Sequence, residues 1–419
     1  MTTDPATVSE TMPAAPDAEP RTRWDIVTLA ILAGVVAAIQ VGKVPPALPI
    51  LREELDIGLV TAGWVASLVN ICGATLGVAS GLIVARMGTR RIALASLVVL
   101  ALGGWIGAIA ESGTMLLVSR FLEGLGLVGT VVTSPAIVRA ACRLADRNLA
   151  LGLWGAYLPG GVAVALLAAP AMIEAYGWRG FWWGNVALTL AFSLVAAAGL
   201  SPRYWSLAVP PAGTARPNVW RALTRPGPWL FGICFSVYAL MFFAVTVWLP
   251  TFLIEAKGWT LGEAAFGVAM VVVANTAGNI ISAALMHRGV QRWKLLLTAY
   301  SGYILFSWFI FAEPAPDALR LPAAMLFTLI GGLLPAACMA GGAAHAREPS
   351  EVATMSGIIV QGANTGSLLG APVMAVTVTV LGGWDQGYWL ILLLGGLGIA
   401  LVSTLLRRVE ETLDTQTDR

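Results

Sequence analysis

The sequence predicts an all-α membrane protein of twelve transmembrane helices, arranged as two pseudo-symmetric six-helix bundles. Of its 419 residues, 58% are hydrophobic and only 11% are charged, whereas about 25% of the residues of an average soluble domain are charged. Apolar segments long enough to cross a bilayer recur along the whole chain. Features of the first half also return in the same order in the second half.

Helices are expected, rather than the strands of a barrel, because the apolar runs are continuous and do not alternate in polarity. A hydrocarbon layer about 30 Å thick requires about 20 helical residues. The predicted spans, in chain order, are residues 26–50, 58–84, 92–110, 114–138, 149–174, 181–200, 228–250, 262–286, 295–312, 321–344, 354–380 and 387–406.

Three segments are expected to lie outside the membrane. Residues 1–23 are rich in Pro, Ala, Thr and acidic residues and lack an apolar core, so they predict a disordered cytoplasmic tail and not a signal peptide. Residues 201–227 contain several prolines and arginines, which is typical of a linker, here between bundles at 24–200 and 228–406. Residues 407–419 are expected to form a second cytoplasmic tail.

The distribution of basic residues predicts the orientation in the membrane. Most Lys and Arg of the short loops lie in the even-numbered loops, and the loops on the other side hold only Arg52, Arg179, Lys257 and Arg320. Because basic residues are retained on the cytoplasmic side, the even-numbered loops and both termini are expected to face the cytoplasm of a bacterial inner membrane.

Several short features indicate how the helices are arranged. Leu48-Pro49 matches Leu249-Pro250, and Gly177-Trp178 matches Gly383-Trp384, which is the internal symmetry expected of many transporters. Two ridges of small residues predict close helix contacts, and they consist of Gly73, Gly77 and Gly81 and of Gly362, Gly366 and Gly370. The tryptophans near predicted helix ends are expected to be interfacial anchors, namely Trp24, Trp178, Trp182, Trp183, Trp229, Trp248 and Trp384.

Other classes of protein are excluded by what the sequence contains. The net charge is only +2 and the basic residues are dispersed, so no nucleic-acid partner is expected. His287 and His345 lie at predicted helix ends without Cys or carboxylate at metal-ligand spacing. No Gly-x-x-x-x-Gly-Lys-Ser/Thr loop for a nucleotide is present. We therefore expect no enzyme, no cofactor, no metal and no ATP-driven pump.

The loop after the second span resembles the signature loop of the major facilitator superfamily. It reads Gly-Leu-Ile-Val-Ala-Arg-Met-Gly-Thr-Arg-Arg from Gly81 to Arg91, against the family's usual Gly-x-Leu-x-Asp-Arg-x-Gly-Arg-Arg. Ala85 stands in place of the usual Asp, and Thr89 in place of the usual Arg. The resemblance implies a cytoplasmic gate formed by Gly81, Arg86, Gly88 and Arg90.

Two further stretches resemble the same family. Arg120-x-x-x-Gly124-x-Gly126 is similar to a motif of the family's fourth helix, and the stretch from Leu151 to Gly155 resembles the branch known for cyanate and nitroimidazole transport. The resemblance implies two bundles that rock about a central chamber surrounded by helices 1, 4, 7 and 10. It also implies a small and often anionic substrate.

Three charged residues lie well inside the predicted spans, away from the span ends: Lys43, Arg120 and Glu123. Charges at membrane depth cost about 2.5 to 3.5 kcal/mol on insertion scales, so those that remain usually face a cavity or a partner. We expect these three to be the ionisable groups of a water-accessible chamber. With all three ionised the chamber is net positive, which favours an anionic substrate.

Lys43 follows Gln40 by three residues, so both occupy one helix face, and Pro45, Pro46 and Pro49 are expected to interrupt the helix just beyond. This pattern predicts a kinked, hydrated substrate site. The alternative is that Lys43 extends along the helix to the membrane surface.

Arg120 and Glu123 are also three residues apart and are positioned to pair within one helix. Such a pair has a purely structural explanation. As a functional hypothesis, protonation of Glu123 frees Arg120 for an anion and so couples transport to the proton gradient.

Uncharged polar residues at membrane depth are further candidates for substrate binding, and each alternatively forms only an interhelical hydrogen bond worth about 0.6 kcal/mol. These candidates are Asn70, Tyr157, Tyr238, Asn275, Asn279, Gln361 and Asn364. Asn275 and Asn279 are expected to share a helix face.

The sequence thus predicts a monomeric secondary transporter that imports a small organic or inorganic anion together with protons. Two alternatives stay open: a proton-driven exporter of drugs or metabolites, and a membrane receptor on the same fold that does not transport.

Overall fold

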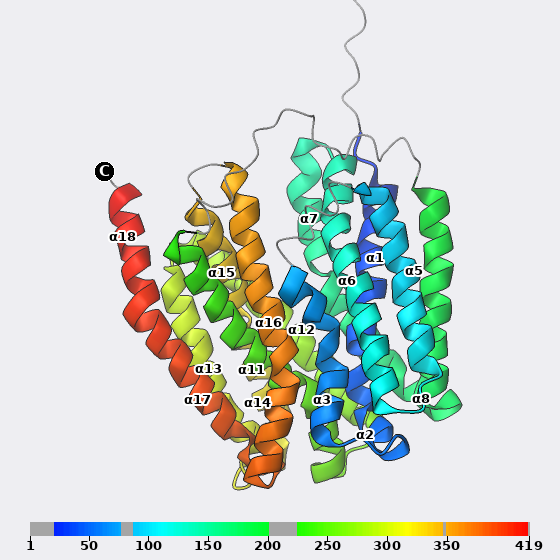
Figure 1. Ribbon diagram of the computed structural model, residues 1–419. Coiled ribbons are helices and arrows are strands. Elements are labelled where there is room, and N and C mark those ends of the chain that lie inside the picture. Colours follow the sequence, from blue (N-terminus) through cyan, green and yellow to red (C-terminus); the bar gives the residue numbers. More distant parts are fainter. Residues whose placement is uncertain (1–20, 77–86, 201–223, 347–348, 418–419) are drawn as a thin grey trace, which may run out of the picture.

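The computed structural model describes residues 21–76, 87–200, 224–346 and 349–417, and this part of the chain consists of helices joined by short turns (Figure 1). Residues 1–20, most of the predicted linker, and the predicted gate residues Gly81 and Arg86 lie outside the described residues. Within the described ranges there is no β-strand, in agreement with the predicted all-α class.

The helices of the first half follow one another in the predicted order. Their bounds are α1 Trp24–Gly42, α2 Val44–Glu54, α3 Leu59–Ser67 with the 3₁₀ turn η1 Leu68–Asn70, α5 Thr89–Ala108, α6 Gly113–Ala141, η2 Leu144–Asp146, α7 Arg147–Gly155 and α8 Tyr157–Gly199.

The helices of the second half repeat this arrangement. Their bounds are α11 Pro226–Lys257, α12 Leu261–His287, α13 Arg292–Phe311, α14 Asp317–Gly331, α15 Leu333–Ala344, α16 Pro349–Leu381, η3 Trp384–Gln386, α17 Gly387–Leu401, the π-helical turn η4 Val402–Leu406 and α18 Arg407–Thr417. α11 begins two residues inside the segment assigned to the linker, and α18 continues through residues assigned to the second tail.

The number of spans follows from the course of α8. Eleven helical stretches of the described chain are long and apolar enough to cross a membrane, and one of them covers Leu144–Gly199. That stretch turns back at Gly177, whose φ of +69° and ψ of 173° are not helical. A backbone of this kind is essentially restricted to glycine. The stretch Leu144–Gly199 therefore contains two antiparallel spans, and the predicted total of twelve is confirmed.

Two spans are interrupted near their middle. The first is divided between Gly42 and Val44, because the prolines at 45 and 46 lack the N–H groups that would continue the helix. The tenth is divided between α14 and α15 at Gly332. At both junctions the backbone stays in the right-handed helical region, so the hydrogen-bond ladder is broken there without the helix being unwound.

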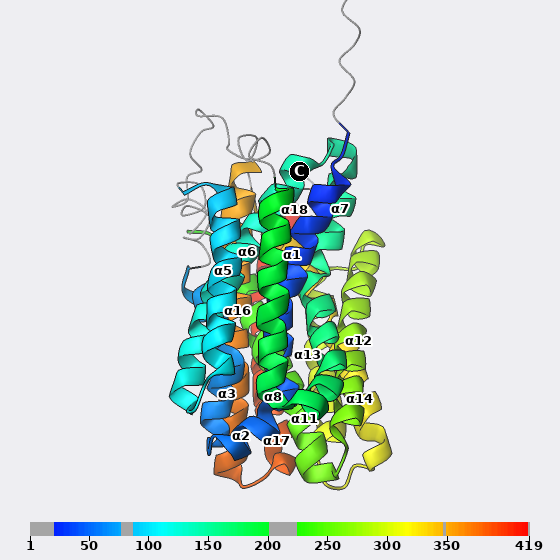
Figure 2. The same ribbon diagram turned by 90° about the vertical axis from the view of Figure 1, so that its right-hand side faces the viewer.

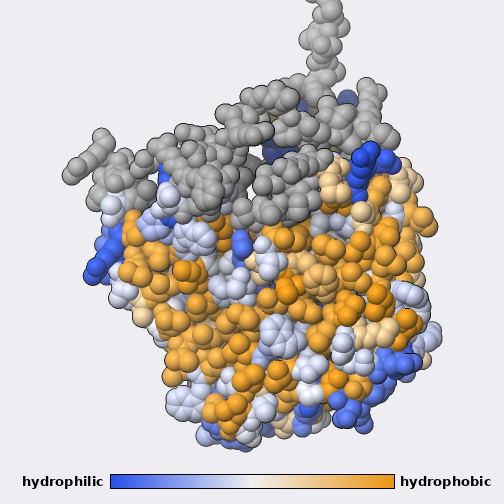
Figure 3. Space-filling model, viewed as in Figure 1, coloured by the Kyte–Doolittle hydropathy of each residue, from blue (hydrophilic) through white to orange (hydrophobic). Residues whose placement is uncertain are grey.

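The two halves form two bundles placed side by side (Figures 1 and 2). Between the bundles, α16 packs against α3, and α12 packs against α8. The starts of α1 and α11 and the end of α18 lie on one side of the molecule in Figure 1, as an even number of spans requires. Apolar side chains form a broad region across the coloured part of the face in Figure 3, as expected for a surface in contact with lipid.

The ridge on α16 brings it close to α11, as predicted. A Cβ on Gly362 would meet the carbonyl oxygen of Gly232, and one on Gly366 would meet that of Ser236. Small residues at these positions allow the two backbones to approach closely.

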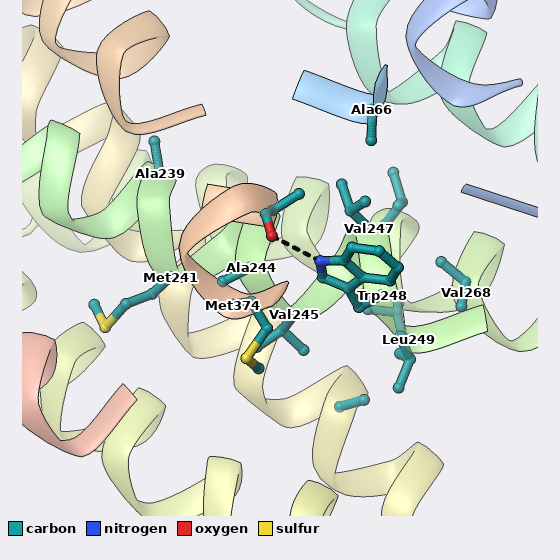
Figure 4. Close-up of a cluster of buried hydrophobic side chains, with 14 of the residues drawn as sticks. Ala66, Ala239, Met241, Ala244, Val245, Val247, Trp248, Leu249, Val268 and Met374 are labelled. Atoms are coloured by element: carbon teal, nitrogen blue, oxygen red, sulfur yellow. Dashed lines mark hydrogen bonds between the residues drawn. The ribbon is translucent and has the colours of Figure 1, made fainter. Parts of the chain in front are cut away.

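The tryptophans predicted as interfacial anchors differ in their exposure, and Trp384 is partly buried. The exposed group consists of Trp24, Trp183 and Trp229. Trp178, Trp182 and Trp248 are buried instead, which corrects the prediction for them. The indole N–H of Trp248 donates to the Ala371 carbonyl at 2.8 Å, so the side chain is held in the core (Figure 4). A tryptophan near a helix end is therefore not always at the surface.

Candidate functional site

Lys43 lies at the junction of α1 and α2, where the helix is interrupted. Its ammonium group donates to the Gln40 side-chain carbonyl at 2.7 Å and to Glu123 Oε1 at 2.5 Å. The first contact confirms that Gln40 and Lys43 share a helix face. Because the Lys43 side chain is 0% exposed, the alternative in which it extends to the membrane surface is wrong.

Arg120, on α6, is held by several acceptors. Its Nε donates to the Val65 carbonyl at 3.0 Å, and its Nη1 donates to the Gln40 carbonyl at 2.8 Å and to Glu123 Oε2. Its Nη2 is buried and has no hydrogen-bond partner among the residues that the structure describes. One donor of a buried cation is thus left without an acceptor, which is unfavourable at this depth.

Lys43, Arg120 and Glu123 together form what we call the charged cluster. The single carboxylate uses one oxygen for each cation, so the cluster holds one positive charge in excess when all three groups are ionised. The predicted pairing of Arg120 with Glu123 is present. The contact between Lys43 and Glu123, which joins the first and fourth spans, was not predicted.

The charged cluster lies inside the N-terminal bundle. Glu123 packs against α5, where a Cβ on Gly103 would stand 2.8 Å from Glu123 Cγ. On the second arm of α8, the Trp182 ring centroid lies 4.7 Å from Lys43 Nζ. All three charged side chains are fully buried. The expected exposure to a water-filled chamber is therefore not seen in this conformation, because the mutual pairing of the charges allows the bundle to pack around them.

The other polar candidates of the first half form local contacts. Gln40 also donates to Thr189 Oγ1 at 3.4 Å, so it belongs to the surroundings of the charged cluster. Asn70 is buried and donates to the Ser67 carbonyl at 3.1 Å. Tyr157 stacks on Trp154 with ring centroids 4.7 Å apart.

In the second half the structure brings three candidates together. Asn275 donates to the Tyr238 hydroxyl at 2.9 Å and to the Thr328 carbonyl at 3.0 Å, and Asn279 donates to the Asn275 side chain at 3.3 Å. Asn275 and Asn279 share a face, as predicted. This group adjoins the interruption of the tenth span, since a Cβ on Gly332 would meet the Asn275 carbonyl.

The remaining candidates lie elsewhere. Asn364 donates to the Val360 carbonyl at 2.8 Å and fills the space where Gly73 of the other bundle lacks a side chain. Gln361 is half-buried on α16. Among the gate residues, Gly88 has a φ of +87° and precedes α5, and Arg90 lies in the first turn of that helix.

Sequence reasoning missed two buried groups. Trp182 was assigned to the interface because it lies near a predicted helix end, yet it contacts Lys43. Arg320 was assigned to a loop, yet it is 2% exposed and donates to the Ile310 carbonyl at 2.7 Å and to Asp317 at 2.6 Å. The i, i+3 spacing of Asp317 and Arg320 is a signal for that pair, whereas only the packing of α8 against α1 reveals Trp182.

Comparisons with known proteins agree with the fold. The chain is 24% identical to the putative niacin/nicotinamide transporter NiaP of Bacillus subtilis, over 68% of this chain and 73% of that protein. It is 25% identical to the cyanate transport protein CynX of Escherichia coli, over 78% and 84% of the respective chains. An uncharacterized MFS-type transporter of Mycobacterium tuberculosis is 30% identical over 45% of this chain, and the match spans only 27% of that longer protein.

Solved structures show the same architecture. The crystal structure of a bacterial homolog of the human lysosomal transporter Spinster, in an inward-facing and occupied conformation, gives a TM-score of 0.74 at 15% identity over 94% of both chains. This likeness concerns the fold alone. The model of the Major Facilitator Superfamily matches residues 30–341. The chain is a multi-pass membrane protein that belongs to the Major Facilitator Superfamily.

Proposed function

We propose that the protein is a secondary transporter that imports a small organic or inorganic anion together with a proton, and that the charged cluster binds both. The observation that supports this proposal is the position of Glu123, whose carboxylate lies between the two buried cations. Glu123 occupies the place that a substrate anion would take.

The charges of the cluster couple the two ligands. While Glu123 is ionised, its oxygens accept from Lys43 and Arg120, and the Nη2 of Arg120 has no hydrogen-bond partner among the described residues. When Glu123 takes up a proton, both cations lose their counter-ion in a medium of low dielectric constant. An anion then replaces the lost negative charge. Proton and anion therefore favour each other's binding, as symport requires.

One relative supports an anionic substrate. CynX is described as a cyanate transport protein, and cyanate is an anion at neutral pH. In this proposal the chain acts as a monomer in the bacterial inner membrane with both termini in the cytoplasm, and the two bundles rock about the midplane.

Uptake by proteoliposomes tests the proposal. Vesicles that hold the purified protein, acidified outside, are offered labelled formate, cyanate and nicotinate. We expect accumulation of at least one anion, driven by the pH gradient, and loss of uptake in Lys43→Ala. Lys257→Ala is the matched control, because Lys257 lies at the end of α11 and pairs with the exposed Glu313 at 3.5 Å.

The same vesicles separate the alternatives. Counterflow without net uptake in a pH gradient would indicate an exchanger that is not coupled to protons. Binding without counterflow would indicate a receptor, and efflux of cationic dyes in place of anion uptake would indicate an exporter. Normal uptake by a well-folded Lys43→Ala variant would refute the role of the charged cluster.

A further inference from the structure

A group of apolar side chains, which we call the apolar layer, lies beyond the charged cluster on the side that faces the termini. Its buried members are Ala37, Val41, Val69, Leu100 and Leu127. Leu127 follows Glu123 by about one helical turn. Leu127 is therefore nearer than Glu123 to the end of α6 at Ala141. This end lies on the side of the termini, because the Ala141 carbonyl accepts from the backbone N–H of Arg23 at the start of α1. An anion moving between the cluster and this side of the protein must pass the layer.

Phe243 joins this layer from the other bundle. It lies on α11 and packs against the layer together with Val131, Leu158 and Val162 of the N-terminal half. Among the described side chains of the layer and those packed against it, Phe243 is the one supplied by the C-terminal half. When the bundles rock, Phe243 is therefore the member that moves relative to the charged cluster.

The neighbouring Phe242 points into its own bundle. Its ring stacks with Tyr238 at a centroid distance of 5.9 Å, and Tyr238 in turn stacks with Tyr303 at 5.6 Å. Phe242 and Phe243 meet edge to face at 5.4 Å. The two side chains thus have the same chemistry and adjacent positions but face different surroundings, so one serves as a control for the other.

The other walls of the charged cluster leave no room for a larger ligand. A Cβ on Gly103 would come within 2.8 Å of Glu123, and one on Gly107 would come within 2.8 Å of the Trp182 ring. These walls belong to α5 and α8 and stay with the cluster as the bundle moves. A path for an anion to the cluster therefore has to open on the side of the apolar layer.

We infer that Phe243 determines substrate specificity by limiting the size of the anion that reaches the charged cluster, an inference that rests on the proposed anion transport. The aromatic side chain admits anions of few atoms, such as formate or cyanate, and excludes anions that carry a ring. The carboxylate, which the cations recognise, is common to both kinds of anion, so the discrimination lies in the apolar part of the substrate.

Counterflow of formate and of benzoate in proteoliposomes tests this inference, because the two anions share a carboxylate and differ in bulk. The wild type should exchange formate and not benzoate. Phe243→Ala should raise the ratio of benzoate to formate exchange by about tenfold or more, the discrimination typical of a reshaped apolar pocket. Phe242→Ala should leave the ratio unchanged.

An unchanged ratio in Phe243→Ala, or an equal rise in Phe242→Ala, would overturn the inference. So would a wild type that exchanges benzoate as readily as formate, although anion transport would then still hold. If Phe243→Ala does not fold, Phe243→Leu takes its place, and its ratio should rise in the same direction. A folded wild type that exchanges neither anion contradicts the proposed function and the inference with it.

Discussion

At the scale of single residues, Glu123 is the group on which the site depends. It is the common partner of Lys43 and Arg120, and all three side chains are buried. Removing one partner of a buried ion pair typically costs about 3 to 5 kcal/mol, because the remaining charge loses its counter-ion. In this cluster the loss of Glu123 leaves two like charges close together, so it is the most severe of the three deletions.

We predict that Glu123→Gln lowers the free energy of unfolding by about 3 to 5 kcal/mol. Small anions should restore part of this stability, because they replace the missing carboxylate, and they should raise the melting temperature of the variant more than that of the wild type. Thermal unfolding in detergent with and without formate measures both effects. Glu313→Gln, which removes an exposed carboxylate, is the control.

The same variant tests the coupling of transport to protons. Gln cannot release a proton, so Glu123→Gln should retain counterflow of the anion and lose accumulation driven by a pH gradient. Uptake by the variant that stayed fully dependent on an imposed pH gradient would show that the proton binds at another site.

Some contacts of the site follow from the sequence and others do not. The pairs Gln40 with Lys43 and Arg120 with Glu123 were predictable, because residues three apart in a helix lie on one face. The contact of Lys43 with Glu123 depends on how α1 packs against α6, and local spacing holds no information about this packing. The burial of the site in this conformation depends on the same packing.

At the scale of the elements, Gly177 determines how the fifth and sixth spans reverse direction. Its φ of +69° with ψ of 173° lies in a region that other residues avoid at a cost of about 1 to 3 kcal/mol. The predicted spans 149–174 and 181–200 lie on either side of this glycine, because the polar Glu174 and Arg179 interrupt the apolar pattern. The turn was thus located by the sequence pattern, although its conformation was not.

We predict that Gly177→Ala lowers the free energy of unfolding by about 1 to 3 kcal/mol. Gly160→Ala is the matched control, since Gly160 lies in the same helix with open space around it and without a positive φ. Because alanine favours helix more than glycine, the control should be neutral or slightly stabilising. Chemical denaturation in micelles compares the two, and equal effects would contradict the role given to the turn.

The contact of α16 with α11 gives a second prediction at this scale. Gly366→Val should destabilise the C-terminal bundle by about 1 to 3 kcal/mol, because its side chain would collide with the Ser236 carbonyl. Gly396→Val on α17 has open space and should cost less. The melting temperatures of the two variants, measured in the same detergent, provide the comparison. A smaller loss for Gly366→Val would show that the ridge is not closely packed.

At the scale of the whole molecule, the bundles meet on the side away from the termini. There Arg52 on α2 donates to Glu255 on α11 at 2.5 Å, and a Cβ on Gly63 would stand 3.0 Å from the Pro372 backbone. The half-exposed ion pair is worth about 1 kcal/mol or less. Even so, such an amount changes the balance between two conformations several-fold.

We predict that Arg52→Glu increases the fraction of molecules in which the ends of α2 and α11 are separated, because it places like charges across the interface. The double variant Arg52→Glu, Glu255→Arg should restore the original fraction. Distances between spin labels on the ends of α2 and α11 measure the fraction of molecules in which these ends are separated. Arg179→Glu is the control, since Arg179 pairs with Glu54 inside one bundle, and a control as effective as Arg52→Glu would contradict the prediction.

The overall architecture was the part most open to prediction. Continuous apolar segments have few alternatives to spanning a bilayer as helices, and the repeated Leu-Pro and Gly-Trp pairs indicated two related halves. The two halves nevertheless differ in their cores. The core of one bundle holds the charged cluster, whereas that of the other holds stacked rings such as Tyr303 and Phe327, with centroids 3.7 Å apart.

Isothermal titration of the purified protein with formate or cyanate measures directly whether the charged cluster binds an anion. The wild type and Lys257→Ala should bind the anion with the same affinity and take up a proton as they do so. Binding by Lys43→Ala should be lost. If folded Lys43→Ala binds the anion as well as the wild type, the charged cluster is not the substrate site.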